Sequence, residues 1–309
     1  MRTGYDILGL GAVTVDDFLY VKAYPAADTK VRVSTRERQC GGNTGTALVA
    51  AARLGAKCAY AGILGNDPLS AFIRSTLEKE GVDVTHVVTH GSTVPIYAVI
   101  VVDETHRTRT IFVDFLDEAG ADATHPPEDV IRSAKVLIVD QHGMEGMIRA
   151  ARILHVAPRV SHVVADLESS ASPRFHELLA LVDHLILPVA FARELTGKFD
   201  PVSVVKALDR EDTDTVAVTW GKQGVWYLSK ENPGEVRRQE AFLVETVDTT
   251  GCGDVFHGAY ASALARGLTC PERIRLAAAA AAIKATQPGG QRGIPTLPVV
   301  EAFLAQHPS

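Results

Sequence analysis

The chain has 309 residues, of which 46% are hydrophobic and 22% are charged, as in an ordinary globular protein of one large domain with a small appendage. Its formal net charge of −6 and the lack of Lys or Arg runs argue against a nucleic-acid partner. No segment is typical of a signal peptide or of a membrane span, and the four cysteines share no C-x-x-C spacing, so we expect a cytoplasmic protein without a membrane partner.

The first predicted elements alternate strands with helices. Residues 6–13 are almost continuously apolar, which predicts a buried strand of a parallel sheet. The next core elements, in chain order, are a helix over Thr46–Leu54, a strand over Ala59–Leu64 and a helix over Leu69–Glu80. This order favours βαβ units.

Two segments break the alternation, because they contain extended stretches without helices. These stretches are Phe18–Val21, Lys30–Ser34, Tyr97–Val102 and Thr108–Val113. They predict a small separate sheet that covers the carboxyl ends of the main strands, where open α/β sheets bind ligands. We therefore predict a core made of residues 1–13, 39–94 and 116–309, and a lid made of residues 14–38 and 95–115.

Further core strands are predicted over residues 136–139, 163–165, 185–187 and 216–218, with helical runs between many of them. Alternation of this kind predicts an α/β fold in which a mostly parallel sheet carries helices on both faces.

The segment 248–254 (DTTGCGD) is the most informative motif in the chain. It follows an extended stretch, Phe242–Val247, and opens a helix. A Gly-X-Gly turn before a helix directs several backbone N–H groups toward an anion, and Asp254 adds a carboxylate in the first turn. Phosphoryl transfer to an alcohol requires both features. The alternative is a tight turn in which Asp254 only places charge at the helix start.

Other motifs have a functional and a structural interpretation each. Gly41-Gly42-Asn43 suits a hinge that lets a sugar approach the backbone, or a plain turn. Asp16 could accept hydrogen bonds from sugar hydroxyls, or it could be a solvated loop residue. Thr219-X-Gly221-X-X-Gly224 suits a nucleotide site, or a β-hairpin turn. Arg109 could bind a phosphate, or it could be a solvated surface charge.

Taken together, these motifs resemble the PfkB (ribokinase-like) family of carbohydrate kinases over nearly the whole chain. The tail 287–295 (QPGGQRGIP) adds to the likeness. Within the family, Thr93–Ile96 and Arg109–Ile111 are similar to ketohexokinases. Asp254–Gly258 and Pro288–Gly290 are similar to sulfofructose-kinase-like members.

The resemblance implies a ribokinase-like, Rossmann-type three-layer α/β/α core with a small β-sheet lid, ATP as the donor, and Mg²⁺ carried in with ATP. It implies Asp254 as the catalytic base and the amides of Gly251, Cys252 and Gly253 as the anion hole. The implied substrate-binding residues are Asp16, Gly41, Gly42, Asn43, Thr46 and Arg109. The implied ATP-binding residues are Thr219, Gly221 and Gly224. The implied ligands of a monovalent cation, K⁺, are Asp248, Thr250, Gln287 and Gly289.

This chain departs from the family pattern at several sites. Thr46 stands where ketohexokinases and ribokinases usually offer an Asn to the sugar, and His142 stands where a sulfonate-binding Arg would be expected. Cys252 stands where many members have Ala, which suggests thiol sensitivity. The N-x-x-E element would fall near Pro188–Phe191, and neither of its residues is present.

We interpret the chain as an ATP-dependent sugar kinase that acts on a primary hydroxyl of a ketose or pentose, and we expect a homodimer through the lid. The alternatives are a kinase for an anionic sugar (6-deoxy-6-sulfofructose or 2-keto-3-deoxygluconate), a nucleoside kinase, and a non-catalytic sugar or nucleotide sensor.

Overall fold

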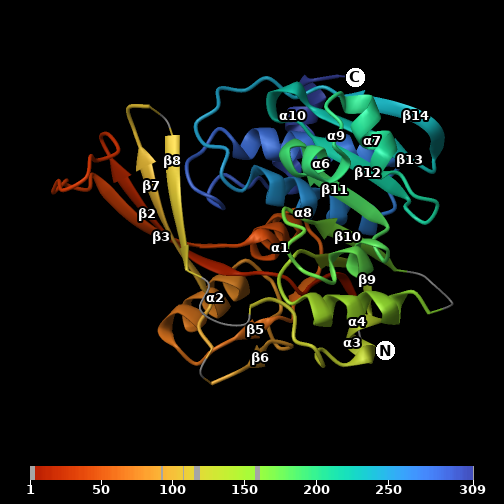
Figure 1. Cartoon of the computed structure of the whole chain (residues 1–309), viewed down its shortest axis with the longest axis horizontal. Helices are drawn as coiled ribbons and strands as arrows, with labels where there is room; N and C mark the ends of the chain where they lie inside the picture. The colour runs from red at the N-terminus through yellow and green to blue at the C-terminus, as the bar shows by residue number, and fades with distance from the viewer. Residues whose placement is uncertain (1–3, 92, 107, 115–118, 157–160, 309) are drawn as a thin grey trace.

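The computed structural model describes residues 4–308 except 92, 107, 115–118 and 157–160. Within this part of the chain, an eight-stranded sheet carries helices on both faces, and a four-stranded sheet stands beside it (Figure 1). A two-stranded ribbon completes the strands described. The structure therefore has the predicted α/β core and the predicted separate sheet.

The large sheet has the strand order β14-β13-β12-β11-β10-β9-β1-β4. The strands from β4 to β12 in this order run parallel, whereas β13 pairs antiparallel with β12, and β14 pairs antiparallel with β13. Their bounds are β1 Tyr5–Gly9, β4 Cys58–Tyr60, β9 Ala134–Val139, β10 His162–Asp166, β11 His184–Pro188, β12 Thr215–Thr219, β13 Val225–Ser229 and β14 Asn232–Gln239. Because parallel strands share direction, the residues that end β10, β11 and β12 lie at one edge.

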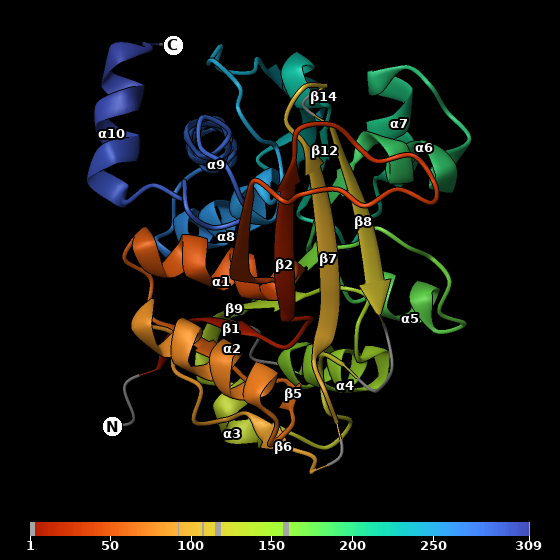
Figure 2. The ribbon, with the colours of Figure 1, turned by 90° about the vertical axis from the view of Figure 1, so that its left-hand side faces the viewer.

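Two helical layers cover this sheet (Figures 1 and 2). One contains α1 Asn43–Arg53, α2 Pro68–Lys79, α8 Cys252–Ala265, α9 Cys270–Lys284 and α10 Leu297–Gln306. The other contains α3 Glu128–Ile131, α4 Met144–Leu154, α5 Phe175–Leu179, α6 Val189–Thr196 and α7 Pro201–Leu208. Successive strand residues point to opposite layers: Ile138 joins the first cluster and Leu137 the second. Both faces need apolar residues, which explains the continuous apolar runs.

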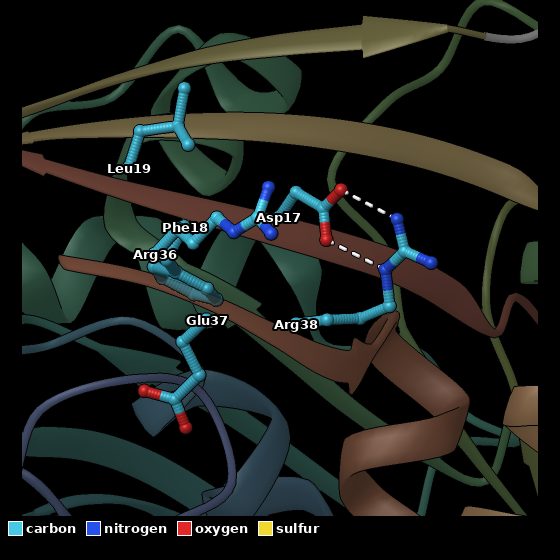
Figure 3. A pocket seen from close by; sticks show the side chains of 6 residues that line it. All are labelled: Asp17, Phe18, Leu19, Arg36, Glu37 and Arg38. Atoms are coloured by element: carbon cyan, nitrogen blue, oxygen red, sulfur yellow. Dashed lines mark hydrogen bonds and ion pairs between the residues drawn. The ribbon is translucent and has the colours of Figure 1, made fainter. Parts of the chain in front are cut away.

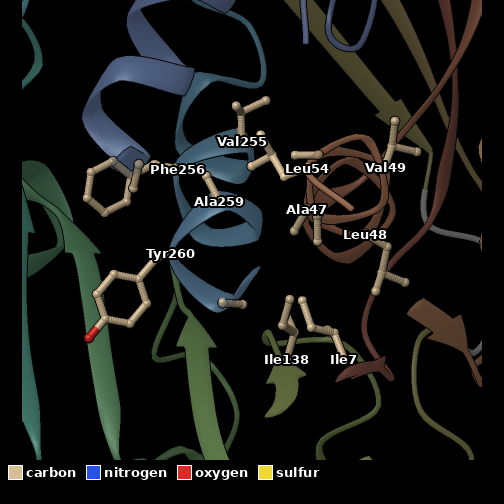
Figure 4. Close-up of a cluster of buried hydrophobic side chains, with 14 of the residues drawn as sticks. Ile7, Ala47, Leu48, Val49, Leu54, Ile138, Val255, Phe256, Ala259 and Tyr260 are labelled. Carbon is tan, nitrogen blue, oxygen red and sulfur yellow. The ribbon is translucent and has the colours of Figure 1, made fainter. Parts of the chain in front are cut away.

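Helices α1 and α8 pack closely in the first layer (Figure 4). Gly258 permits this approach, because a Cβ atom added there would lie 2.0 Å from the backbone oxygen of Ala47. A larger side chain at position 258 would push the two helices apart. The close packing fixes the start of α8, and with it Asp254.

The second sheet has the order β3-β2-β7-β8, with bounds β2 Thr14–Val21, β3 Thr35–Gly41, β7 Ile96–Asp103 and β8 Thr108–Asp114. Strand β2 pairs antiparallel with β3 and parallel with β7. Three of the four predicted strands are confirmed. The prediction of a strand at Lys30–Ser34 is wrong, because β3 begins at Thr35.

The pairing register explains that error. The last paired residues of β2 and β3 are Tyr20 and Thr35, and the Ser34 amide still donates to the backbone oxygen of Tyr20 at 2.8 Å. Residues 30–33 lie beyond that pairing, so β2 does not complete their backbone hydrogen bonds. Val31 and Val33 are exposed there. Their alternation with charged residues resembles a half-buried strand, but alternation cannot show where a partner strand ends.

Three other core predictions need correction. The first strand, predicted over residues 6–13, is shorter, because β1 ends at Gly9. The strand predicted over Ala59–Leu64 is two short strands, because the chain leaves the large sheet after β4 and forms β5 (Ile63–Leu64), which pairs with β6 (Val88–Thr89). Helix α1 begins at Asn43 rather than at Thr46, because Gly42 with φ of 86° already turns the chain into the helix. The predicted core–lid boundary between 115 and 116 lies outside the described residues. No helix in the part of the chain described has the length and apolar character that a bilayer span requires.

Candidate active site

The turn before α8 is built from glycines. Gly251 has φ of 76°, and a Cβ atom there would lie 2.7 Å from the backbone oxygen of Gly290. The Cys252 amide donates to the backbone oxygen of Thr249 at 3.2 Å. Within the described part of the chain, the amides of Gly251 and Gly253 have no protein acceptor. The helix start can therefore offer these two N–H groups to an anion.

Asp254 lies in the first turn of α8, directly behind that turn. Burial raises the pKa of Asp254 well above its ordinary value, and the neighbouring carboxylates of Asp166 and Glu168 raise the pKa further. A carboxylate with a raised pKa is a stronger proton acceptor, which is the property of a general base.

Asp166, which the sequence analysis did not single out, ends β10 and is 3% exposed. Its Oδ2 atom accepts a hydrogen bond from Asn43 Nδ2 at 3.3 Å and lies 3.4 Å from Nδ1 of His257. Burial and then the charge of Asp166 raise the pKa of nearby Glu168. The position of Asp166 directly after a predicted strand was a usable signal, since ligand sites form at this edge.

His257, to which the sequence analysis assigned no role, lies on α8 one turn after Asp254. Its Nδ1 atom is 2.9 Å from the backbone oxygen of Gly253, and its Nε2 atom is 3.0 Å from that of Ile186. Carbonyl oxygens only accept, so both contacts are hydrogen bonds when both ring nitrogens carry protons.

The predicted sugar-side residues meet where β2, β3 and α1 join. Oδ1 of Asp16 accepts a hydrogen bond from Thr14 Oγ1 at 2.7 Å, and a Cβ atom added at Gly41 would lie 2.0 Å from Asp16 Oδ2. A Cβ atom at Gly42 would lie 2.6 Å from the backbone oxygen of Ala12. Burial raises the pKa of Asp16 to about 6. Both glycines are therefore required for the carboxylate and the backbone to lie together.

Two predicted substrate residues have other partners in this structure. Thr46 is buried, and its hydroxyl accepts a hydrogen bond from Gln291 Nε2 at 3.3 Å. Arg109, on β8, places Nη1 3.5 Å from Oγ1 of Thr249. Arg109 therefore extends from the second sheet to the loop that leads into α8.

The predicted nucleotide residues lie at the carboxyl end of β12. Thr219 ends that strand, and Gly221 and Gly224 belong to the turn that leads into β13. A Cβ atom at Gly224 would lie 2.1 Å from the backbone oxygen of Gln239. This turn is thus a β-hairpin, as the structural interpretation expected, and it lies at the same sheet edge as Asp166.

The predicted cation ligands also come together. Oδ1 of Asp248 accepts from the Thr250 amide at 2.8 Å, and Oδ2 accepts from the Gly289 amide at 2.9 Å. The Gln287 amide donates to the backbone oxygen of Lys284 at 3.1 Å. Lys284, which the sequence analysis missed, is fully buried and donates from Nζ to the backbone oxygen of Asp248 at 3.0 Å.

Two hollows lie on the second sheet. One, of about 430 Å³, is lined by Asp17, Phe18, Leu19, Arg36, Glu37 and Arg38. Figure 3 shows that Arg38 and Asp17 are paired through two contacts in it, and no predicted site residue lines it. The other, of about 330 Å³, is lined by Tyr20, Thr35, Arg36, Glu37, Pro288 and Arg292. It lies between the second sheet and the loop that contains Gly289.

The chain is similar to carbohydrate kinases over most of its length. The pfkB family carbohydrate kinase profile matches residues 6–297. The ribokinase of Haemophilus influenzae is 30% identical, over 96% of this chain and 97% of that protein. The 2-dehydro-3-deoxygluconokinase of Bacillus subtilis is 24% identical, over 88% of this chain and 89% of that protein.

Among solved structures, the Arabidopsis thaliana ribokinase complexed with ribose and ATP superposes with a TM-score of 0.82. It has 22% identity over 97% of this chain and 98% of that one. The fold is therefore ribokinase-like. The nearer likeness to ketohexokinases or sulfofructose-kinase-like members stays a prediction. This protein is a carbohydrate kinase that belongs to the pfkB family.

Proposed function

We propose that this kinase transfers the γ-phosphoryl group of ATP to a primary hydroxyl of a ketose or pentose, with Asp254 as the base. One observation carries the proposal: the Asp254 carboxylate, with its raised pKa, stands in the first turn of α8, next to the Gly251 and Gly253 amides, which have no acceptor among the described residues. These two features supply a proton acceptor and an anion site at the same point.

In the proposed reaction, the sugar hydroxyl attacks the γ-phosphorus in line with the departing ADP oxygen. Asp254 accepts the hydroxyl proton as the new O–P bond forms. The Gly251 and Gly253 amides, with that of Cys252 when it leaves Thr249, hold the transferring group. His257, bonded to the backbone oxygen of Gly253, holds this turn in place. Asp16, Gly41, Gly42 and Asn43 would hold the sugar, and Thr219, Gly221 and Gly224 would line the nucleotide site.

The carboxylates at this edge suit Mg²⁺, which prefers oxygen ligands. Asp166 and Glu168 would hold the ion, because their carboxylates lie close enough to each other and to Asp254 for their charges to add to the effect of burial in raising the pKa of Glu168 and of Asp254. When bound, Mg²⁺ neutralises charge on the ATP phosphates. Asp166 and Glu168 would bind Mg²⁺ in place of the N-x-x-E element, whose residues are absent at Pro188–Phe191.

We further propose that the second sheet acts as a lid. It reaches the core through Arg109 and Thr249, through Gln39 Oε1, which accepts from the Gly290 amide at 2.9 Å, and through an ion pair between Glu37 and Arg292. Closure over the sugar would exclude water from the transferring group.

We further infer that the Lys284 ammonium supplies the positive charge for which the sequence suggested K⁺. A monovalent cation would need oxygen ligands in this loop, but both carboxylate oxygens of Asp248 already accept from amides, and its backbone oxygen accepts from Lys284. The residues present therefore fit a built-in cation better than a bound one.

An anionic sugar is the second candidate acceptor. The likeness to a 2-dehydro-3-deoxygluconokinase favours it, and Arg36 and Arg292 line the hollow between the second sheet and the 288–292 loop. Arg36 would bind a carboxylate or sulfonate at the far end of the sugar, whereas Arg292 is already paired with Glu37, which lines the same hollow.

The test is ADP release with Mg²⁺-ATP across fructose, ribose, tagatose, 6-deoxy-6-sulfofructose, 2-keto-3-deoxygluconate and adenosine. We expect turnover with a neutral ketose or pentose and, for Asp254→Asn, a loss of about 10²–10⁴-fold with ATP binding retained. Asp212→Asn, which alters an exposed carboxylate, is the control. Selective turnover of an acidic sugar would favour the second candidate. Ligand binding without ADP release would favour the sensor.

We also propose a homodimer through the lid. Strand β8 is an edge strand, and it exposes the consecutive apolar residues Ile111, Phe112 and Val113. Exposed apolar edges are usually covered or paired. Phe112→Glu should convert a dimer to a monomer in sedimentation experiments, whereas Phe199→Glu, at an exposed site between α6 and α7, should not.

A further inference from the structure

We propose that His162, His184 and Asp214 form a binding site for a divalent transition-metal ion of the zinc type, separate from the kinase site. His162 opens β10, His184 opens β11, and Asp214 directly precedes β12. These three strands are adjacent and parallel. The cluster therefore lies at the amino edge of the sheet, opposite the carboxyl edge where Asp166 lies.

The spacing of the donor atoms suits a tetrahedral ion. Nε2 of His184 is 3.3 Å from Nδ1 of His162, and Nδ1 of His162 is 3.6 Å from Oδ2 of Asp214. Zn²⁺ bound at about 2.0–2.1 Å with tetrahedral angles separates two ligand atoms by about 3.3–3.4 Å. The third pair of donors lies within 4.8 Å, so a small side-chain rotation completes the triangle.

Neighbouring groups hold the ligands in a suitable orientation. Nδ1 of His184 lies 3.0 Å from the Tyr260 hydroxyl, which leaves Nε2 directed at the cluster. A metal-bound histidine ordinarily has such a partner on its other nitrogen. Lys230 contacts Oδ1 of Asp214 at 3.2 Å, so Oδ2 remains the metal-facing oxygen. The Lys230 side chain is half-exposed and can turn toward solvent when a cation binds.

The donor set selects the class of metal. Two imidazole nitrogens and one carboxylate oxygen suit Zn²⁺ and its neighbours in the transition series, whereas Mg²⁺ prefers oxygen donors alone. His162 and Asp214 are partly exposed, so an ion can enter from solvent and keep a water molecule as the fourth ligand.

Binding here would stabilise the helix that carries Asp254. Tyr260 lies on α8, on the flank away from α1 (Figure 4), and connects that helix to His184. A metal ion would link three strands directly and α8 through Tyr260. We therefore expect metal binding to raise the melting temperature of the whole chain.

The test is calorimetric titration of chelator-treated protein with Zn²⁺ in the presence of excess Mg²⁺, which competes with Zn²⁺ for the carboxylates proposed to hold Mg²⁺ in the kinase site. We expect one ion per chain. His162→Ala and Asp214→Asn should each weaken binding by at least about tenfold, and Tyr260→Phe by about 10–100-fold. His106→Ala is the control, because His106 contacts a single carboxylate, Asp103, at 2.8 Å.

Two readouts identify the ligands. Co²⁺ should give the intense visible absorption of a tetrahedral site in the wild-type protein and in His106→Ala, and should lose it in His162→Ala. Zn²⁺ should raise the melting temperature of the wild-type protein but not of Asp214→Asn. Zn²⁺ binding that survives both ligand substitutions, or no binding above that of Mg²⁺, would overturn the proposal.

Discussion

The side-chain nitrogen of Lys284 donates a hydrogen bond to the backbone oxygen of Asp248 at 3.0 Å, although the lysine is fully buried. Burial lowers the pKa of Lys284, and the nearby charge of Asp248 opposes that shift. Lys284 ends α9, and its ammonium group contacts the loop that leads into α8. A fixed positive charge at this position favours the anion held by the turn.

Removing this lysine should make the kinase depend on potassium. Lys284→Ala removes the charge and leaves room for an ion among the oxygens of the loop. We expect turnover to fall by about tenfold in Na⁺ buffer, equivalent to roughly 1.4 kcal/mol, and to recover in K⁺ buffer. The wild-type protein should be equally active in both. Steady-state assays at matched ionic strength measure this.

Lys284→Met is the matched control, because it removes the charge but still fills the space. It should lose activity without recovery in K⁺. If the alanine variant stays insensitive to K⁺, or the wild-type enzyme requires it, Lys284 does not replace a cation.

Sugar binding should weaken in acid because of Asp16. Burial raises the pKa of this carboxyl to about 6, and its ionised form accepts hydrogen bonds through both oxygens, whereas one oxygen of the protonated form carries a proton. Sugar affinity, measured by calorimetry without ATP, should therefore fall as the pH drops through about 6. This loss of sugar affinity in acid should persist in Asp254→Asn and should be absent in Asp16→Asn. If the loss of affinity in acid is absent in Asp254→Asn instead, the group that titrates is Asp254 and not Asp16.

The buried Asp16 carboxylate should also lower the free energy of unfolding at neutral pH. The folded pKa of Asp16 is raised above 3.8, so its contribution to stability is full below that value and is lost as the pH rises through about 6. Asp16→Asn should therefore raise the melting temperature more at about pH 7.5 than at about pH 4.5.

Asp17 provides a control of opposite sign. The hydrogen bond from Arg38 lowers the pKa of Asp17, so its contribution is present at neutral pH and is lost in acid. Asp17→Asn should lower the melting temperature at about pH 7.5. A rise in both variants would show that burial of Asp16 is not the cause.

Cys252 should be slow to react with thiol reagents. The sequence suggested sensitivity, but burial raises the pKa of this thiol to about 11, so little thiolate forms at neutral pH. Its Sγ atom also contacts the backbone oxygen of Ala281 at 3.5 Å. Cys252→Ala should keep near wild-type turnover, because the proposed anion site uses the backbone amide. Rapid inactivation by iodoacetamide, prevented by ATP, would contradict this.

The two glycines of the turn should respond differently to alanine. Gly251→Ala forces a positive φ on alanine and brings Cβ within 2.7 Å of the Gly290 oxygen, so it should destabilise the fold by about 1–3 kcal/mol. At Gly253 an added Cβ meets no protein atom within 4 Å, so Gly253→Ala should change the unfolding free energy by less than about 0.5 kcal/mol. Denaturant titration compares the two variants. An equal loss of unfolding free energy in the two variants would mean that backbone strain at Gly251 does not cause the destabilisation.

Much of the fold was predictable because its patterns are local. Strands β9 to β12 lie within two residues of their predicted positions, since their apolar runs are short and bounded by polar residues. The strand at Lys30–Ser34 failed because strand pairing depends on a distant segment, and the register with β2 ends at Tyr20. The number of strands in the second sheet was predictable, but the point at which its pairing ends was not.

The sequence by itself determined the turn at 248–254 and the position of Asp254 in the first turn of α8, because a glycine turn and the helix after it are consecutive in the chain. Only the tertiary structure decided what surrounds Asp254. Asp166 and Asn43 meet across 123 positions, and Lys284 reaches Asp248 across 36. The conformation of a turn depends on its own backbone, whereas the charge around a carboxylate depends on which distant groups packing brings close to it.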